Sequence, residues 1–172
     1  KAFIESENDK VSRAKNGDFV REGDKIRTES NGHVHIQFID RAVLSVRPRS
    51  ELQIVAYSFD AANPENSLVK LNLIEGTART VSGEAAKTAR DRFRLNTPIA
   101  AIGVRGTDFV VSTSSNSVKA LVNDGAIIMA PYSAQCLQGG TGPCELNSIE
   151  LGGQSMQILE FDSDMTQPRL VP

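Results

Sequence analysis

Short stretches of this chain alternate between apolar and polar residues. The alternation is clearest over residues 33–38, 51–54 and 69–73, where every second side chain is Val, Ile, Leu or Phe. A period of two places successive side chains on opposite faces of a β-strand, whereas an amphipathic helix repeats every 3.6 residues. Helical periodicity is almost absent from the sequence. The pattern therefore predicts a chain built mainly from half-buried strands.

Residues that favour tight turns separate these stretches. Gly, Asn, Asp, Pro and Ser adopt positive φ angles or fix a turn, and they cluster at residues 16–18, 22–24, 30–32, 47–50, 75–76 and 123–125. Turn signals at intervals of about 8 to 12 residues are typical of all-β proteins. We therefore predict an all-β fold of packed short antiparallel sheets that form a sandwich, a roll or a short solenoid. At most one short helix is expected, in the Ala-rich and charged residues 83–93.

The length of 172 residues suits a single domain with one apolar core. We therefore expect one domain over residues 1–172. The alternation stops at residues 131–147, which indicates a long surface loop. The first residue is Lys rather than Met, which favours a processed protein or an excised domain.

The chain has two cysteines, and both lie in this loop. Cys136 and Cys144 flank the stretch "LQGGTGP", whose glycines and proline let the chain fold back on itself. A metal or redox pair is the alternative, but the spacing is not C-x-x-C and no histidine lies nearby. We therefore predict a disulfide bond, which would place the protein in an oxidising compartment such as the periplasm or the cell surface.

The charges exclude two classes of partner. The sequence has 19 basic and 21 acidic side chains and a net charge of -2. Nucleic acids and anionic membranes attract clustered basic surfaces, so neither is an expected partner. No run approaches the roughly 18 apolar residues of a membrane-spanning helix, and we expect no direct membrane insertion by these residues.

His33 and His35 are the candidate metal ligands, because residues two apart on a strand project from the same face. A cupin-like metal enzyme would use such a pair inside its barrel. Here Val34, Ile36 and Phe38 take the apolar face, so we expect both imidazoles to point to solvent.

No other arrangement of residues supports catalysis. Neither a nucleophile with a base, nor paired carboxylates in one motif, nor a sufficient set of metal ligands occurs at workable spacing. We therefore expect no enzyme and no cofactor. An enzyme would need a buried polar cluster in a cleft, formed by residues distant in the sequence.

The stretch "NTPIAAIGVRGTDFVV" at residues 96–111 places turn residues within a strand pattern. Pro98 suits a strand start or edge, and Gly103 and Gly106 permit bends or close backbone approach. Arg105, next to Gly106 and Thr107, could bind backbone carbonyls exposed by the bend, as a structural clamp. The alternative is that Arg105 in this turn contacts an anion or a partner.

The order of these signals resembles the FecR-type domain. The amino-terminal part of the resemblance is "GDFVREGDKIRTESNGHVHIQFIDRAVLSVRPRSELQI" at residues 17–54. The carboxyl-terminal part consists of "LNLIEGTAR" at 71–79, "FRLNTPIAAIGVRGTDFVV" at 93–111 and "VNDGAIIM" at 122–129. The resemblance covers about residues 10–160, and its most specific element is the Thr-Pro and Gly-Val-Arg-Gly-Thr pair after the Glu-Gly hairpin.

This resemblance implies a non-catalytic, periplasmic protein-interaction module of the bacterial envelope. In the name-giving members the domain is the periplasmic part of a membrane-bound sigma-factor regulator that senses a TonB-dependent outer-membrane receptor. The same domain is reused in larger envelope proteins beside peptidoglycan-binding or repeat domains. The implied partners are therefore other envelope proteins, including an outer-membrane receptor, or the cell wall. A scaffold module that binds peptidoglycan or polysaccharide remains open as the alternative.

Overall fold

One hydrogen-bonded sheet contains all 13 strands of the protein, and the computed structural model describes all residues 1–172. All strand pairs are antiparallel except the parallel pair β7–β8. This arrangement confirms the all-β prediction. The strands are β1 (Ala2–Glu5), β2 (Val11–Arg13), β3 (Lys25–Thr28), β4 (Val34–Gln37), β5 (Val43–Val46), β6 (Glu51–Ser58), β7 (Leu68–Val81), β8 (Phe93–Asn96), β9 (Ala100–Thr113), β10 (Ser117–Pro131), β11 (Ile149–Gly152), β12 (Ile158–Asp162) and β13 (Arg169–Val171).

The three longest strands, β7, β9 and β10, each contain a glycine with a positive φ angle. Gly76 has a φ angle of 91°, Gly106 of 57° and Gly125 of 79°. On either side of this glycine the strand pairs with different neighbours. Residues 68–75 of β7 pair with β6 and β8, whereas residues 76–81 pair with β5 and β9. The glycines therefore let one sheet change direction.

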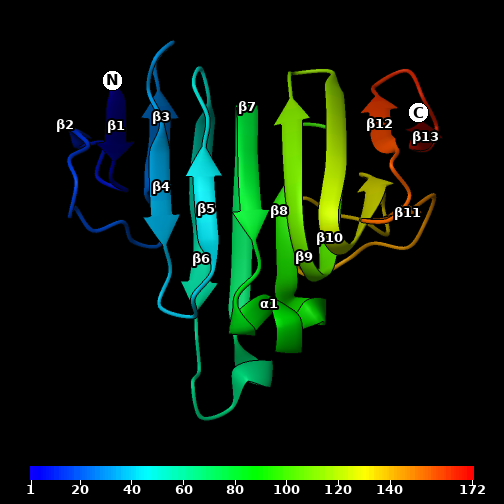
Figure 1. Cartoon of the computed structure of the whole chain (residues 1–172), viewed down its shortest axis with the longest axis horizontal. Coiled ribbons are helices and arrows are strands. Elements are labelled where there is room, and N and C mark those ends of the chain that lie inside the picture. Colours follow the sequence, from blue (N-terminus) through cyan, green and yellow to red (C-terminus); the bar gives the residue numbers. More distant parts are fainter.

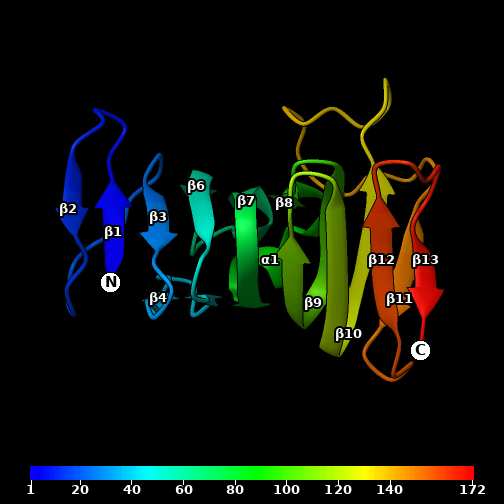
Figure 2. The same ribbon diagram turned by 90° about the horizontal axis from the view of Figure 1, so that it is seen from above.

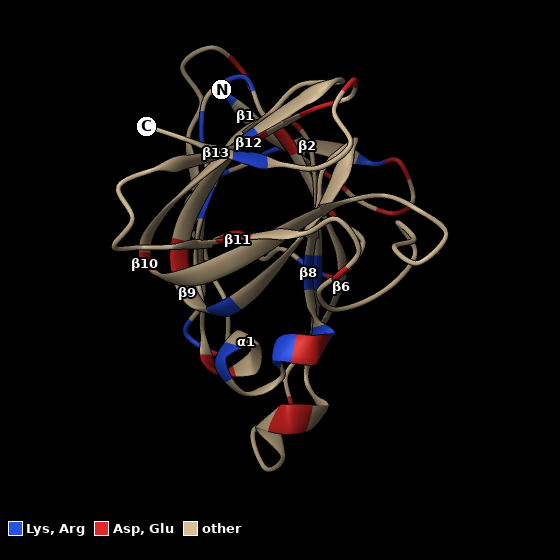
Figure 3. Cartoon of the chain, turned by 90° about the vertical axis from the view of Figure 1, so that its right-hand side faces the viewer, with Lys and Arg blue, Asp and Glu red and all other residues tan.

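The changes of direction divide the sheet into two layers. One layer contains the whole of β4, β5, β12 and β13, together with the second halves of β7 and β9 and the first half of β10. The remaining strand segments form the other layer. Figure 1 shows β4 drawn over β3 and β5 over β6, and Figure 3 shows the strands around a central interior. A single cluster of 26 buried apolar residues, which includes Leu44 from one layer and Leu52 from the other, fills this interior.

The single α-helix lies within the predicted region. α1 (Glu84–Thr88) is followed by the short 3-10 turn η2 (Arg90–Arg92), and a second 3-10 turn, η1 (Pro64–Asn66), precedes β7. No helix of the protein has the length and apolar character needed to cross a membrane.

Buried Asp40 ties the β4–β5 turn to the helix and to β6. Its carboxylate accepts a hydrogen bond from the backbone N–H of Ala85 at 3.1 Å and one from the hydroxyl of Tyr57 at 2.8 Å. Burial and this hydrogen bond raise the pKa of Tyr57 above its ordinary value. Tyr57 also stacks on Phe38, with 4.8 Å between the ring centroids. Asp40 therefore fixes the end of β4.

The molecule is elongated, with its termini at opposite ends. Figures 1 and 2 both place β1 and the N-terminus at one end and β13 and the C-terminus at the other. Basic and acidic segments are interspersed in Figure 3, consistent with the small net charge of -2.

The bends give a prediction for Gly125. A Cβ atom at this position would lie 2.2 Å from the carbonyl oxygen of Gly106, whereas a Cβ at Gly106 would meet nothing nearer than 3.6 Å. Both glycines have positive φ angles. We expect Gly125→Ala to lower the free energy of unfolding by about 3 kcal/mol, because the backbone strain and the steric clash add. We expect Gly106→Ala to lower it by about 1 kcal/mol, because only the backbone strain applies there. Urea denaturation measures both; equal losses would contradict this account of the bend.

The ion pair between Arg79 and Asp108 gives a pH-dependent prediction. The guanidinium of Arg79 on β7 donates two hydrogen bonds, at 2.9 and 2.7 Å, to the carboxylate of Asp108 on β9. These bonds hold the pKa of Asp108 below its ordinary value. The stabilisation is present above the unfolded carboxyl pKa of about 4 and is lost as the pH falls through the lower folded value.

We therefore expect Asp108→Asn to lower the melting temperature most near neutral pH and progressively less below about pH 4. The exposed Asp164 makes no hydrogen bond through its side chain, so Asp164→Asn is the matched control. A deficit in Asp108→Asn that stays constant down to acid pH would show that the ion pair is not its cause.

Candidate interaction surface

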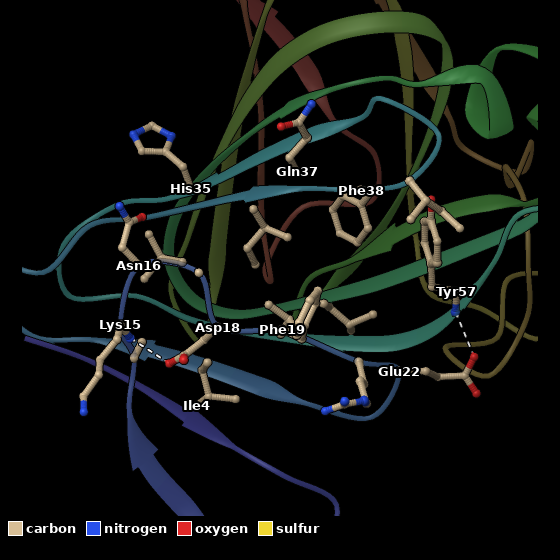
Figure 4. Close-up of a pocket in the computed structure, with 18 residues that line it drawn as sticks. Ile4, Lys15, Asn16, Asp18, Phe19, Glu22, His35, Gln37, Phe38 and Tyr57 are labelled. Atoms are coloured by element: carbon tan, nitrogen blue, oxygen red, sulfur yellow. Dashed lines mark hydrogen bonds between the residues drawn. The ribbon is translucent and has the colours of Figure 1, made fainter.

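A groove of about 460 Å³ lies between β4 and residues 14–22, which connect β2 to β3. Ten of its 18 lining residues are hydrophobic, so the groove suits an apolar group better than a charged one. Ile4, Ile36 and Phe38 contribute to this lining, and Figure 4 shows Phe38 and Phe19 directed into the space between the strands.

Two large apolar side chains beside the groove are open to solvent. Phe19 is 81% exposed and Ile39 is 78% exposed. Isolated exposed apolar side chains are common on proteins, but these two border the same apolar groove, and apolar surface gathered in one place is typical of a contact surface. Phe19 lies within the turn "NGDFV", and the sequence alone does not show that this turn faces β4.

Backbone hydrogen bonds hold the wall formed by residues 14–22. The carboxylate of Asp18 accepts a hydrogen bond from the backbone N–H of Lys15 at 2.8 Å. The carboxylate of Asp24 accepts one from the backbone N–H of Arg21, also at 2.8 Å. The Glu22 carboxylate accepts from the backbone N–H of Tyr57 at 3.0 Å, as the dashed line in Figure 4 shows. These carboxylates therefore support the shape of the groove.

The histidine pair lies at the rim of this groove. His33 and His35 are both exposed, as the alternation predicted, with 4.3 Å between their ring centroids. Partial burial and the neighbouring His35 and Arg47 lower the pKa of His33. Nδ1 of His35 is hydrogen-bonded to the hydroxyl of Ser45 at 2.8 Å. No third His, Cys, Asp or Glu joins them as a group that could hold a metal ion.

The conspicuous stretch at residues 96–111 has a structural role at several positions. Pro98 lies in the turn before β9, where the Thr97 hydroxyl accepts a hydrogen bond from the backbone N–H of Ala100 at 3.0 Å. Gly103 is buried, and a Cβ there would lie 2.6 Å from Cβ of Pro143. The buried hydroxyl of Thr107 donates to the carbonyl of Ala126 at 2.6 Å and so links β9 to β10.

Arg105 does not act as the expected clamp. Its side chain is 62% exposed, and its guanidinium lies 3.8 Å from the carboxylate of Glu150 rather than on backbone carbonyls. The carbonyls near the bend are met instead by the shorter hydroxyl of Thr107, because Arg105 occupies an outward-facing position of β9. Arg105 therefore remains available for contact with a partner.

The residue that does clamp backbone carbonyls is Arg94, which sequence reasoning missed. Arg94 on β8 is only 2% exposed. Its guanidinium donates to the carbonyls of Gly142 at 2.6 Å and Leu137 at 2.9 Å. Burial lowers its pKa. Arg94 lies between Phe93 and Leu95, so the two-residue period of a strand directs its side chain to the opposite face from theirs. No local signal indicates that a loop more than forty residues away covers it.

That loop is closed by the predicted disulfide bond between Cys136 and Cys144. Figure 2 shows it as the gold and amber segment that projects beside β8–β10. Nη2 of Arg94 also lies 3.3 Å from Sγ of Cys144, and the side-chain amide of Asn96 donates to the carbonyl of Gln138 at 2.8 Å. The disulfide and two polar residues of β8 therefore hold the loop against the sheet. Lys70, a polar position in the alternating stretch of residues 69–73, is also buried, on β7 beside Arg94.

The clamp gives a stability prediction for Arg94→Met. Methionine retains most of the side-chain volume but donates no hydrogen bond, so the loop carbonyls lose their charged donor. We expect the free energy of unfolding to fall by about 1 to 3 kcal/mol, with faster amide hydrogen exchange in residues 137–142. Arg105→Ala is the matched control, and we expect it to change stability by at most about 0.5 kcal/mol. Unchanged exchange in the loop of Arg94→Met would contradict the role of the clamp.

Comparison with solved structures reveals relatives of the fold. Two crystal structures of a putative anti-sigma factor from Parabacteroides distasonis ATCC 8503 align with TM-scores of 0.57 and 0.55 at 14% sequence identity. Each alignment covers 86% of this chain and 58% of the other, so this chain spans little more than half of that protein. At this identity the likeness shows a shared fold. A search of curated proteins finds no match.

The family comparison agrees with the resemblance seen in the sequence. The family described as FecR protein matches residues 24–127. This segment begins just before β3 and extends into β10, so it contains the three glycines at which β7, β9 and β10 bend. The match covers more than half of the 172 residues, and the chain therefore belongs to the FecR family.

Proposed function

We propose that this chain is a non-catalytic protein-interaction module of a FecR-type envelope or signalling protein, and that the groove beside β4 is its contact surface. The observation that carries the proposal is the apolar groove flanked by exposed Phe19 and Ile39. Family membership associates the chain with regulatory proteins of the bacterial envelope.

The groove supplies contact area rather than groups poised for chemistry. The carboxylates of Asp18 and Glu22, both in its lining, accept hydrogen bonds from backbone N–H groups. Each of these carboxylates therefore has a structural partner in the wall of the groove. At the rim, His35 is hydrogen-bonded to the hydroxyl of Ser45.

The disulfide bond supports a periplasmic or cell-surface location for this module. Such bonds persist in oxidising compartments and are rare where thiols are kept reduced. The Cys136–Cys144 bond closes a loop that Arg94 holds against the sheet, which gives the bond a structural context. The proposed partner is therefore another protein of the envelope.

A capture experiment tests this function. The immobilised chain is exposed to periplasmic and outer-membrane extracts, and a double variant, Phe19→Ser with Ile39→Ser, is treated in the same way. We expect one specific partner to bind the parent chain and to be lost with the variant. The matched control is Leu137→Ser with Met156→Ser, which changes exposed side chains away from the groove.

Sedimentation with purified peptidoglycan completes the test. We expect the chain to remain in the supernatant. The proposal would be contradicted if the parent chain and the groove variant sedimented equally with peptidoglycan and the parent chain captured no protein. That pair of results would establish a wall-binding scaffold.

A further inference from the structure

The strand at the mouth of the groove has an open edge. β4 pairs with β5 and with no other strand. The backbone N–H of Phe38 donates to the carbonyl of Ala42 at 2.9 Å, and the same register pairs Ile36 with Leu44. Hydrogen-bonded and non-hydrogen-bonded pairs alternate in an antiparallel ladder. The backbone groups of His35 and Gln37 therefore point away from β5, toward the open side.

The layer beneath β4 extends beyond it. β3 continues to β1, and β1 continues to β2, whereas the layer above ends at β4. Figure 1 shows β4 over β3, while β1 and β2 have no strand drawn over them. Ile4 of β1 lines the groove. A further strand could therefore pair with β4 in the space above β1, and this chain supplies no strand there.

The groove continues into a second hollow whose charged side chains are mainly basic. The two hollows share Ile4, Lys15 and Phe19 among their lining residues, and Lys10 and Arg13 belong to the second. None of these three basic side chains takes part in an ion pair. Figure 4 places Lys15 on the His35 side of the groove, opposite the side of Glu22 and Tyr57. One end of the missing strand would therefore lie beside unpaired positive charge.

We propose that the groove binds an extended segment of a partner protein, which adds as an antiparallel strand to the open edge of β4. This inference rests on the proposed function and identifies the chemistry of the partner. Apolar side chains at alternate positions of the segment enter the groove beside Phe19 and Ile4. Because the added strand runs opposite to β4, its carboxyl-terminal end lies at the Lys15 side and carries Asp or Glu.

A second copy of this chain does not fit the groove. The apolar side chains of its own β4 would be Val34, Ile36 and Phe38, and these pack against the core of the same molecule. Its outward-facing side chains would be His33, His35 and Gln37, which are polar. Pairing of two β4 edges would join backbones but leave the apolar groove unfilled.

A designed peptide tests strand addition directly. The probe is a fluorescent peptide of about ten residues, enough to span an ordinary strand, with alternating valine and threonine and an aspartate-rich carboxyl end. Its matched control ends in lysines. We expect the acidic peptide to bind the folded chain and to protect the amide protons of His35 and Gln37 from hydrogen exchange, whereas the lysine-ended peptide binds about tenfold more weakly.

Two pairs of variants locate the contact. Gln37→Pro removes an N–H from the open edge without removing a β4–β5 hydrogen bond, so we expect about tenfold weaker binding; Gln37→Ala keeps this N–H and should bind as the parent does. Lys15→Glu should weaken binding of the acidic peptide, whereas the same charge reversal at exposed Lys119 should not. Lys15→Glu alters a surface side chain and so remains informative if Gln37→Pro destabilises the fold.

Binding that is equal in all four variants, or no protection of His35 and Gln37, would overturn strand addition. Self-association of the chain that Gln37→Pro abolishes would instead identify a second copy as the occupant. Capture of an envelope partner that depends on Phe19 but not on the Gln37 amide would leave the interaction module standing and reject only this mode of binding.

Discussion

The need of a single sheet to bury its own apolar face governs this structure. With one short helix, the protein has no second layer of helices to cover its strands, so the sheet must turn back upon itself. Gly76, Gly106 and Gly125 make that possible, because a residue with a Cβ atom adopts positive φ angles only at a cost. At Gly125 the demand is also steric, since the backbone of Gly106 occupies the space a Cβ would need. The core, the loop clamp and the groove all depend on these turns.

The two layers formed in this way do not match at the N-terminal end. A closed barrel would leave no edge, but this sheet remains open, and the upper layer stops at β4 while the lower layer continues through β1 and β2. Proteins usually protect such edges with charge, short length or a covering loop. Here β4 is only four residues long and residues 14–22 lie across the gap, yet Phe19 and Ile39 stay exposed. The protection is partial, which is why this edge can serve as a contact surface.

Much of the fold could be predicted from the sequence, because strand periodicity and turn chemistry are local. Alternation identified the burial of Ile36 and the exposure of His33 and His35, and the glycine-rich spacer identified the disulfide bond. The error over Arg105 and the omission of Arg94 have one physical cause. Both residues occupy outward-facing strand positions, and only the long-range path of residues 131–147 decides that Arg94 is covered and Arg105 is not. The groove was invisible for the same reason, since it joins segments separated by a turn and a strand.

The groove is built before any partner arrives, and this shapes how it can bind. Three carboxylates, those of Asp18, Asp24 and Glu22, accept hydrogen bonds from backbone N–H groups in or beside the wall of the groove. The carboxylate of Asp40 accepts one from the hydroxyl of Tyr57, whose ring stacks on Phe38. Ordering a loop on binding costs free energy that would otherwise appear as affinity, and a preformed wall avoids that cost. The burden of ordering then falls on the partner segment, which must become extended to pair with β4. An interaction of this kind favours specificity through side-chain spacing and charge, and it lets a flexible partner engage and release.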